Sequence, residues 1–304
     1  MQLLLEENEI VFNDVSLPIC REKGISLEIA RLDLIHPVVS GNKLFKLCYF
    51  MEASLRAGKK TILTFGGAYS NHLVATAYAC RQAGVNCIGV VRGDRPALPS
   101  HTLQHCESYG MKLHFIPRNI FDEQKNAPRF HEELQTMFGE AIIVPEGGYH
   151  PLGAKGASLI MKKITARLPT HVCTAVGTAT TLAGLLLNPL NNEKVVAVPA
   201  IKNMTDIPER LSYLGCESFS NRLIIADEFH FGGYAKKNDQ LIGFMNEFYL
   251  SSGIPTDFVY TAKLMFGIIR KIESGYFEPG SRVICLHTGG LQGNDSLPEG
   301  TLVF

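Results

Sequence analysis

The chain has 304 residues, of which 46% are hydrophobic, and its 29 lysines and arginines balance its 29 aspartates and glutamates. This length is enough for two domains, since single hydrophobic cores stop growing at roughly 250 to 300 residues. A net charge of zero argues against nucleic acid or a membrane surface as a partner, and no apolar run has membrane-spanning length. A small neutral or zwitterionic ligand fits the composition better.

Short apolar runs alternate with segments of helical period along the chain, a pattern typical of an α/β fold. We expect strands at 61–65, 86–91, 112–116, 141–144, 171–176, 194–198, 222–225 and 282–287. We expect helices at 43–57, 71–83, 98–109, 128–138, 153–168, 181–187, 207–214, 239–251 and 262–274. Most of these strands are apolar throughout, as in parallel strands covered on both faces. The sequence therefore predicts open, twisted, mostly parallel sheets flanked by helices.

A segment rich in glycine and proline, 145–153, separates a first group of β/α units from a second. We interpret it as the crossing between two domains. Ligands of open α/β sheets bind beyond the carboxyl ends of the strands, so the glycine-rich turns at those ends are the places to search for a site.

Eight cysteines are scattered along the chain without a Cys-x-x-Cys pair or metal-type spacing to histidines. They indicate buried thiols in a reducing cytoplasm, and no metal site is predicted. Residues 1–14 are acidic and lack the features of a secretory signal, which also favours a cytoplasmic location.

Lys43 stands at the start of a strongly amphipathic segment, directly after Ser40, Gly41 and Asn42. Ser40 and Asn42 are residue types that cap helices, so Lys43 is expected in the first turn, where the helix dipole disfavours a cation. That position lowers the pKa of the amine, and only a neutral amine attacks an aldehyde to form a Schiff base. The alternative is a solvated lysine near a helix start.

Two glycine-rich turns each connect a predicted strand to a helix. In the first, at 66–72, the Ser70 hydroxyl, the Asn71 amide and the helix N-terminus are suited to a carboxylate. The second, at 177–181, carries hydroxyls and amides suited to a phosphate. Neither matches a nucleotide fingerprint, and each alone is also compatible with an ordinary βα turn. Together with an activated lysine, the two sites suit pyridoxal phosphate and an amino acid.

Six blocks resemble the 1-aminocyclopropane-1-carboxylate deaminase/D-cysteine desulfhydrase family of pyridoxal-phosphate enzymes. They are Ser-Gly-Asn-Lys-Leu-Phe-Lys-Leu at 40–47, Phe-Gly-Gly-Ala-Tyr-Ser-Asn-His at 65–72, Pro-Glu-Gly-Gly-Tyr-His-Pro-Leu-Gly at 145–153, Gly-Thr-Ala-Thr-Thr-Leu-Ala-Gly at 177–184, Thr-Asp-Phe-Val-Tyr-Thr-Ala-Lys at 256–263 and Leu-His-Thr-Gly-Gly at 286–290. They occur in the family's order and span nearly the whole chain.

This resemblance implies the tryptophan synthase β-like fold, which is fold type II of the pyridoxal-phosphate enzymes. It implies a large domain of residues 1–45 plus 153–304, a small domain of residues 46–152, and the cofactor in the cleft between them. A homodimer is implied in the same way.

The resemblance also implies roles for the residues at the cofactor. Lys43 would be the Schiff-base lysine and the acid/base for the α-proton, and Asn71 would hydrogen-bond the ring 3-oxygen. Lys46 would approach the cofactor phosphate, although a solvated or ion-paired lysine is the alternative. The turn that would hold the phosphate consists of Gly177, Thr178, Ala179, Thr180 and Thr181.

Further roles follow by the same resemblance. Ser70, Asn71 and His72 would receive the substrate carboxylate. Tyr234 and Tyr260 match two tyrosines at the cofactor, one of which stacks on its ring while either hydroxyl relays a proton.

The partner of the pyridine nitrogen separates the members of the family, because it sets the strength of the electron sink. Ring-opening deaminases have a glutamate after the second tyrosine and a leucine at the start of the Thr-Gly-Gly block, where this chain has Thr261 and Thr288. Both match the desulfhydrase pattern. We therefore expect α,β-elimination on D-cysteine, or a related β-substituted D-amino acid, giving pyruvate, ammonia and sulfide. The alternatives are ring-opening deamination, D-serine dehydratase or racemase-like activity, and a non-catalytic protein that binds the cofactor or an anion.

Overall fold

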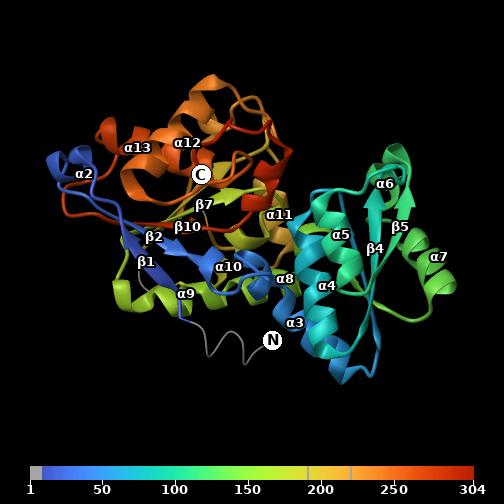
Figure 1. Ribbon diagram of the computed structural model, residues 1–304. Helices are drawn as coiled ribbons and strands as arrows, with labels where there is room; N and C mark the ends of the chain where they lie inside the picture. The colour runs from blue at the N-terminus through green and yellow to red at the C-terminus, as the bar shows by residue number, and fades with distance from the viewer. Residues whose placement is uncertain (1–8, 190–191, 220) are drawn as a thin grey trace.

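The computed structural model describes residues 9–189, 192–219 and 221–304, so part of the N-terminal segment considered above lies outside the described residues. Its strands form two separate sheets, and Figure 1 shows them side by side with helices packed around each. The predicted α/β class with mostly parallel sheets is confirmed. Within the described residues, no helix combines the length and apolar character needed to cross a bilayer.

The larger sheet has six strands in the order β1-β2-β10-β7-β8-β9. Its strands are β1 (Val11–Asp14), β2 (Ser26–Arg31), β10 (Arg282–His287), β7 (His171–Val176), β8 (Lys194–Pro199) and β9 (Leu223–Ile225). Only β1 is antiparallel, and it lies at one edge. Because β2, β10, β7 and β8 run parallel, their carboxyl ends meet at one side of the sheet.

The smaller sheet has four parallel strands in the order β5-β4-β3-β6. They are β5 (Met111–Ile116), β4 (Asn86–Arg92), β3 (Thr61–Gly66) and β6 (Ile142–Val144). These strands lie inside the predicted small domain and those of the larger sheet inside the predicted large domain. The boundaries at 45/46 and 152/153 themselves remain a prediction.

Twelve α-helices among the described residues connect and cover the strands. They are α2 (Pro18–Glu22), α3 (Asn42–Arg56), α4 (Asn71–Ala83), α5 (His101–Ser108), α6 (Arg118–Gln124), α7 (Pro128–Phe138), α8 (Pro151–Ala157), α9 (Leu159–Ile164), α10 (Thr180–Leu187), α11 (Ile207–Tyr213), α12 (Asp239–Ser252) and α13 (Thr261–Glu273).

The structure departs from the predicted elements in two ways. Strands β1 and β2 and the short helices α2 and α6 were not predicted, because segments of four to seven residues carry little periodicity. The single helix predicted at 153–168 is wrong. It is divided at Ser158 into α8 and α9, followed by a 3₁₀ turn at Thr165–Arg167.

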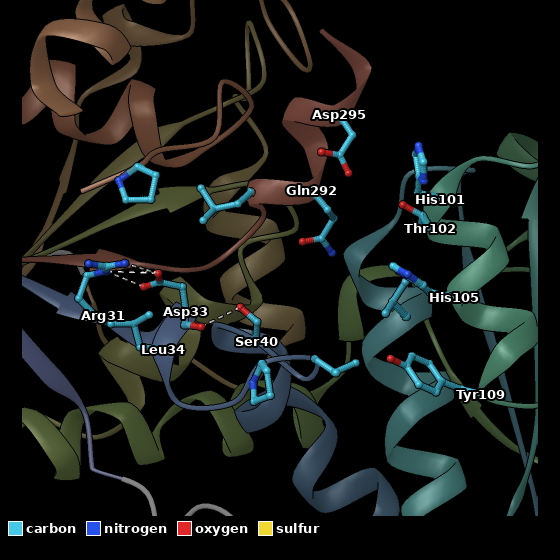
Figure 2. Close-up of a pocket in the computed structure, with 15 residues that line it drawn as sticks. Arg31, Asp33, Leu34, Ser40, His101, Thr102, His105, Tyr109, Gln292 and Asp295 are labelled. Atoms are coloured by element: carbon cyan, nitrogen blue, oxygen red, sulfur yellow. Dashed lines mark hydrogen bonds and ion pairs between the residues drawn. The ribbon is translucent and has the colours of Figure 1, made fainter. Parts of the chain in front are cut away.

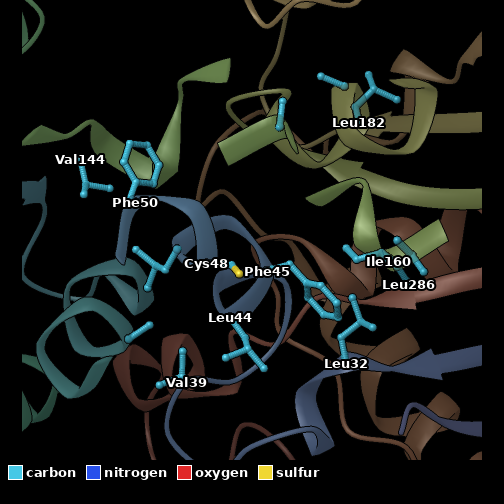
Figure 3. Close-up of a cluster of buried hydrophobic side chains, with 14 of the residues drawn as sticks. Leu32, Val39, Leu44, Phe45, Cys48, Phe50, Val144, Ile160, Leu182 and Leu286 are labelled. Atoms are coloured by element: carbon cyan, nitrogen blue, oxygen red, sulfur yellow. The ribbon is translucent and has the colours of Figure 1, made fainter. Parts of the chain in front are cut away.

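Helix α3 lies at the junction of the two sheets and is packed on several sides. One continuous cluster of buried side chains includes Phe45 and Phe50 of α3, Leu286 of β10 and Val144 of β6, as Figure 3 shows. On another side α8 comes so close that a Cβ at Gly156 would lie 2.1 Å from the Phe45 carbonyl oxygen. The position of α3 is therefore fixed by packing against both parts of the fold.

The N-terminus of α3 is held against the segment that follows β10. Gly41 has φ 69°, and a Cβ placed on it would lie 2.0 Å from the carbonyl oxygen of Thr288. Only glycine combines this left-handed conformation with such a close backbone approach. The contact brings the first turn of α3 to the carboxyl end of the larger sheet.

We expect Gly41→Ala to lower the free energy of unfolding by at least about 2 kcal/mol, because the new methyl group adds a steric clash to an unfavourable φ. Gly58→Ala is the matched control: Gly58 has φ 63°, but nothing lies within 4 Å of its Cβ position. It should cost about 1 kcal/mol. Denaturant unfolding measures both, and equal losses would contradict the importance of the Gly41 contact.

Candidate active site

Lys43 lies in the first turn of α3, where its amine donates a 2.7 Å hydrogen bond to Asn42 Oδ1. Burial lowers the pKa of this amine from 10.5 to about 8, and the Asp257 carboxylate acts in the opposite direction. At pH 7 roughly a tenth of such amines are neutral, on the order of several hundred times more than for an ordinary lysine. The predicted direction of the pKa shift is confirmed, but its main cause is burial.

Neither the Ser40 nor the Asn42 side chain caps α3, contrary to the sequence-based expectation. Gly41 occupies the N-cap position, and the Ser40 hydroxyl instead donates to the Asp33 carbonyl oxygen at 3.3 Å. Asn42 Nδ2 donates to Thr181 Oγ1 at 2.8 Å. Asn42 thus connects the lysine to a helix 139 residues further along the chain.

The predicted phosphate turn follows β7 and leads into α10. Ala179 adopts φ 65° at the helix N-cap, and the Thr178 and Thr180 hydroxyls lie 2.8 Å apart. A cavity of about 70 Å³ is present here. Its lining comprises Asn42, Lys43, Lys46, Gly147, Ala175, Val176, Gly177, Thr178, Ala179, Thr180, Thr181, Leu182, Tyr260 and Thr288. The N-terminus of α10, the three threonines of the turn and the two lysines together suit an anionic group.

Lys46 lies one turn after Lys43 and lines the same cavity. Its side chain is 5% exposed, and its amine donates to the Gly147 carbonyl oxygen at 3.2 Å. Burial and the neighbouring charge of Lys43 lower its pKa well below 10.5. Among the described residues it forms no ion pair, so the solvated or ion-paired lysine considered above is not what the structure contains. A bound phosphate would supply the missing countercharge.

The first glycine-rich turn leads from β3 into α4. The Ser70 hydroxyl accepts a hydrogen bond from the Leu73 N–H as the helix N-cap. Asn71 Oδ1 is buried and has no hydrogen-bond partner within the described residues. A Cβ on Gly290 would lie 3.1 Å from Asn71 Nδ2, so this amide extends across to the segment after β10. An orphaned amide at a helix N-terminus is ready to bind a ligand.

The His72 ring points away from that helix end and into the smaller sheet. Its Nε2 lies 2.9 Å from Thr64 Oγ1, and its Nδ1 is buried without a partner among the described residues. Burial, followed by the charges of Lys43 and Lys46, lowers its pKa to about 3, so the imidazole is neutral. His72 is therefore suited to contribute its backbone N–H to a carboxylate site rather than its ring.

Tyr234 and Tyr260 lie against each other, with their ring centroids 6.0 Å apart and the rings edge to face, and Tyr260 lines the cavity. A Cβ on Gly177 would lie 3.1 Å from the Tyr260 hydroxyl, so the ring covers the phosphate turn. Burial raises the pKa of Tyr260 well above 10, and the pKa of Tyr234 is also raised by desolvation, although its side chain is 58% exposed. Both hydroxyls therefore stay protonated and can act as proton donors.

The two threonines predicted near the pyridine nitrogen differ in their surroundings. The Thr261 hydroxyl donates to Asp257 Oδ1 at 2.6 Å and accepts from the Asp257 N–H at 2.7 Å, and Thr261 does not line the cavity. The carboxylate of Asp257, which is 1% exposed, also accepts from three backbone N–H groups at the start of α13. Thr288 does line the cavity, so of the two it is the better placed for a ligand.

A larger pocket of about 420 Å³ lies between the two sheets, and Figure 2 shows its two walls. One wall includes Ser40 and Gln292, and the other includes Val74 of α4 and His105 of α5. Ser40 lies three residues before Lys43, and Val74 lies about one turn after Asn71. The pocket thus extends to both helix ends that carry predicted site residues.

The residues present fit pyridoxal phosphate. Within the described residues Lys43 and Lys46 form no ion pair, the turn at 177–181 offers a helix N-terminus, and the buried Asn71 Oδ1 has no hydrogen-bond partner. Sequence reasoning missed the roles of Asn42, Gly147 and Asp257. All three lie inside motifs already singled out, but nothing local to them indicated the contacts of Asn42 with Thr181, of Gly147 with Lys46 and of Asp257 with Thr261.

Comparison with known proteins identifies the family to which the chain belongs. The family model described as "Pyridoxal-phosphate dependent enzyme" matches residues 18–289, and the chain belongs to this family. The cofactor is therefore pyridoxal phosphate, and the expectation of a pyridoxal-phosphate enzyme from the six sequence blocks is confirmed.

Curated relatives and solved structures extend this result. The chain is 28% identical over 295 residues to a protein of Pyrococcus abyssi that is provisionally named 1-aminocyclopropane-1-carboxylate deaminase, covering 90% of this chain and 87% of the relative. A Thermotoga maritima protein with the same provisional name is 29% identical over 286 residues, covering 89% and 90%. A crystal structure described as an ACC deaminase homologue has a TM-score of 0.79 at 24% identity, covering 96% and 95%. At that identity the structural match supports the fold alone.

We expect Lys43→Met to stabilise the cofactor-free protein at pH 7 by about 1–3 kcal/mol, because it removes the cost of burying an ammonium. The folded pKa is about 8 and the unfolded one about 10.5, so the unfolded chain binds more protons between these values. The cost is therefore complete below pH 8 and disappears as the pH rises to 10.5.

Unfolding curves at pH 7 and pH 10.5 measure this difference. The exposed Lys112→Met should change stability by less than about 0.5 kcal/mol at both pH values. A loss of stability in Lys43→Met at pH 7 would contradict the prediction.

Proposed function

We propose that this protein is a pyridoxal-phosphate-dependent lyase that catalyses α,β-elimination on D-cysteine or a related β-substituted D-amino acid. The products are pyruvate, ammonia and, from cysteine, sulfide. The single observation that supports this choice most is the hydroxyl of Thr288 at the cavity wall beside Lys43, with no carboxylate side chain among the residues that line this cavity. A hydroxyl does not favour the protonated pyridine ring as a carboxylate does.

Bound pyridoxal phosphate supplies an aldehyde for the lysine amine and an electron sink for the charge left when the α-proton is removed. The turn at 177–181 and Lys46 would hold its phosphate. Asn71 would hydrogen-bond its ring, and the N-terminus of α4 at Ser70 would bind the substrate carboxylate.

Lys43 acts twice in this proposal. Its neutral amine would hold the cofactor, and as a free amine it would take the α-proton of the substrate. The β-substituent would leave as a thiolate, and Tyr260 or Tyr234 would relay to it the proton held by Lys43. The raised pKa of both phenols keeps them protonated at neutral pH, as such a relay requires. A good leaving group departs together with the α-proton, so only a modest electron sink is required.

A panel of D-cysteine, D-serine, L-cysteine and 1-aminocyclopropane-1-carboxylate, assayed for keto acid and sulfide, tests the proposal. We expect pyruvate and sulfide from D-cysteine. Turnover of the cyclopropane alone, with release of 2-oxobutyrate, would overturn this substrate. Turnover of D-serine without sulfide release from D-cysteine would instead favour the dehydratase alternative.

Lys43→Ala should abolish turnover, because it removes both the covalent anchor and the base. Borohydride treatment of the holoenzyme should add the mass of the reduced cofactor to a peptide that contains Lys43, and this adduct should be absent from Lys43→Ala. An adduct without turnover of any substrate in the panel would indicate a non-catalytic cofactor-binding protein. A fully active Lys43→Ala would refute the mechanism.

Thr288→Val and Thr261→Val separate the two threonines. We expect Thr288→Val to change the visible absorption of the bound cofactor and to weaken its binding about fivefold, the value of one hydrogen bond. Thr261→Val should mainly destabilise the fold by about 1–3 kcal/mol, because it leaves a buried carboxylate short of a donor. Spectral titration and denaturant unfolding measure the two effects, and the reverse pattern would assign the ring nitrogen to Thr261.

Ring-opening deamination is the second candidate, since relatives from Pyrococcus abyssi and Thermotoga maritima carry that provisional name. The panel above decides between the two activities. A homodimer and a cytoplasmic location stay predictions from the sequence.

A further inference from the structure

Helix α13 carries a third buried lysine, which the mechanism above does not use. Lys263 is 0% exposed, and its amine donates to the carbonyl oxygen of Gly233 at 2.7 Å and to that of Ala200 at 3.4 Å. It forms no ion pair within the described part of the chain. Burying an amine without an ion-pair partner is unfavourable, so a structural or functional benefit is expected to compensate.

The two carbonyl groups belong to two loops beyond the ends of strands. Ala200 directly follows β8, and Gly233 lies in the loop after β9 that carries Tyr234. This loop contains left-handed backbone at Phe231 (φ 51°), Gly233 (φ 117°) and Ala235 (φ 53°). Such conformations persist only where the surroundings hold them. Gly233, which accepts the hydrogen bond from Lys263, directly precedes Tyr234 and lies within this strained segment.

The other tyrosine of the pair is attached to the same helix. Tyr260 is the N-cap residue of α13, three residues before Lys263. Helix α13 therefore positions Tyr260 as its own N-cap residue, and it holds the loop of Tyr234 through the hydrogen bond from Lys263. The rings of the two tyrosines lie with their centroids 6.0 Å apart. An apolar side chain at position 263 would leave both carbonyl groups buried without that donor.

We propose that Lys263 is a positioning residue, whose amine fixes the loop of Tyr234 so that its hydroxyl faces the cavity beside Tyr260. The effect on catalysis rests on the proposed function, whereas the anchoring of the loop does not. The proposal therefore predicts one effect on the loop itself and one on turnover.

The first test measures amide hydrogen exchange of residues 230–236 in the cofactor-free protein. Lys263→Met should raise the exchange rate of this segment about tenfold, as expected for the loss of one hydrogen bond from a charged donor. Met265→Ala, which makes a cavity on the same helix, is the control for general destabilisation and should not raise exchange selectively at 230–236. Unchanged exchange in Lys263→Met, or the same selective rise in Met265→Ala, would overturn the proposal.

Lys263→Gln keeps an amide donor on a shorter side chain. We expect it to retain part of the protection, and it replaces Lys263→Met in both tests if that variant does not fold. Because its donor is shorter, Lys263→Gln should still exchange faster at residues 230–236 than Met265→Ala does. If it does not, the result contradicts the anchoring of the loop by Lys263.

The second test is a double-mutant cycle in the holoenzyme. Lys263→Met should lower kcat about 10²-fold with a smaller change in KM, as for a misplaced catalytic group. In the background of Tyr234→Phe, the same substitution should cause little further loss. Met265→Ala should leave kcat nearly unchanged. Additive losses would show that Lys263 does not act through Tyr234. If no substrate is turned over, the proposed function fails, while the exchange experiment still decides whether Lys263 anchors the loop.

Discussion

The site depends on the close approach between Gly41 and the carbonyl group of Thr288. This contact joins the first turn of α3 to the carboxyl end of β10. It holds the start of α3, which carries Lys43, against Thr288 at the cavity wall. The packing of α3 between the two sheets then prevents the helix from shifting away, so the backbone contact and the packing together fix the position of Lys43.

Burial is the largest cause of the pKa shifts at this site. It lowers the pKa of Lys43 and Lys46, and together with the charges of these two amines it lowers the pKa of His72 and keeps that ring neutral. Asp257 provides the opposing negative charge from the start of α13, where backbone N–H groups stabilise it. Two amines with few anionic neighbours suit the phosphate dianion that we propose for this cavity.

Local patterns in the sequence predicted most of the fold and part of the site. The apolar strands, the glycine-rich turns and the lysine at a helix start are all features of contiguous residues, and their positions agree with the structure. The missed features join distant segments: Asn42 meets Thr181, and Lys263 meets Gly233. The break of the predicted helix at Ser158 was also missed, because the segment keeps an apolar pattern across it. The roles of individual residues came from the resemblance to a family rather than from spacing.

The order of strands in the two sheets has a consequence for how the chain matures during synthesis. All strands of the smaller sheet lie between residues 61 and 144, so a ribosome makes every one of them before it reaches β7, β8 and β10 of the larger sheet. The larger sheet needs β10, which pairs with β2 across 250 intervening residues. Its closure must therefore wait until β10 has been synthesised, and the cavity that Thr288 helps to line cannot form on the nascent chain before then.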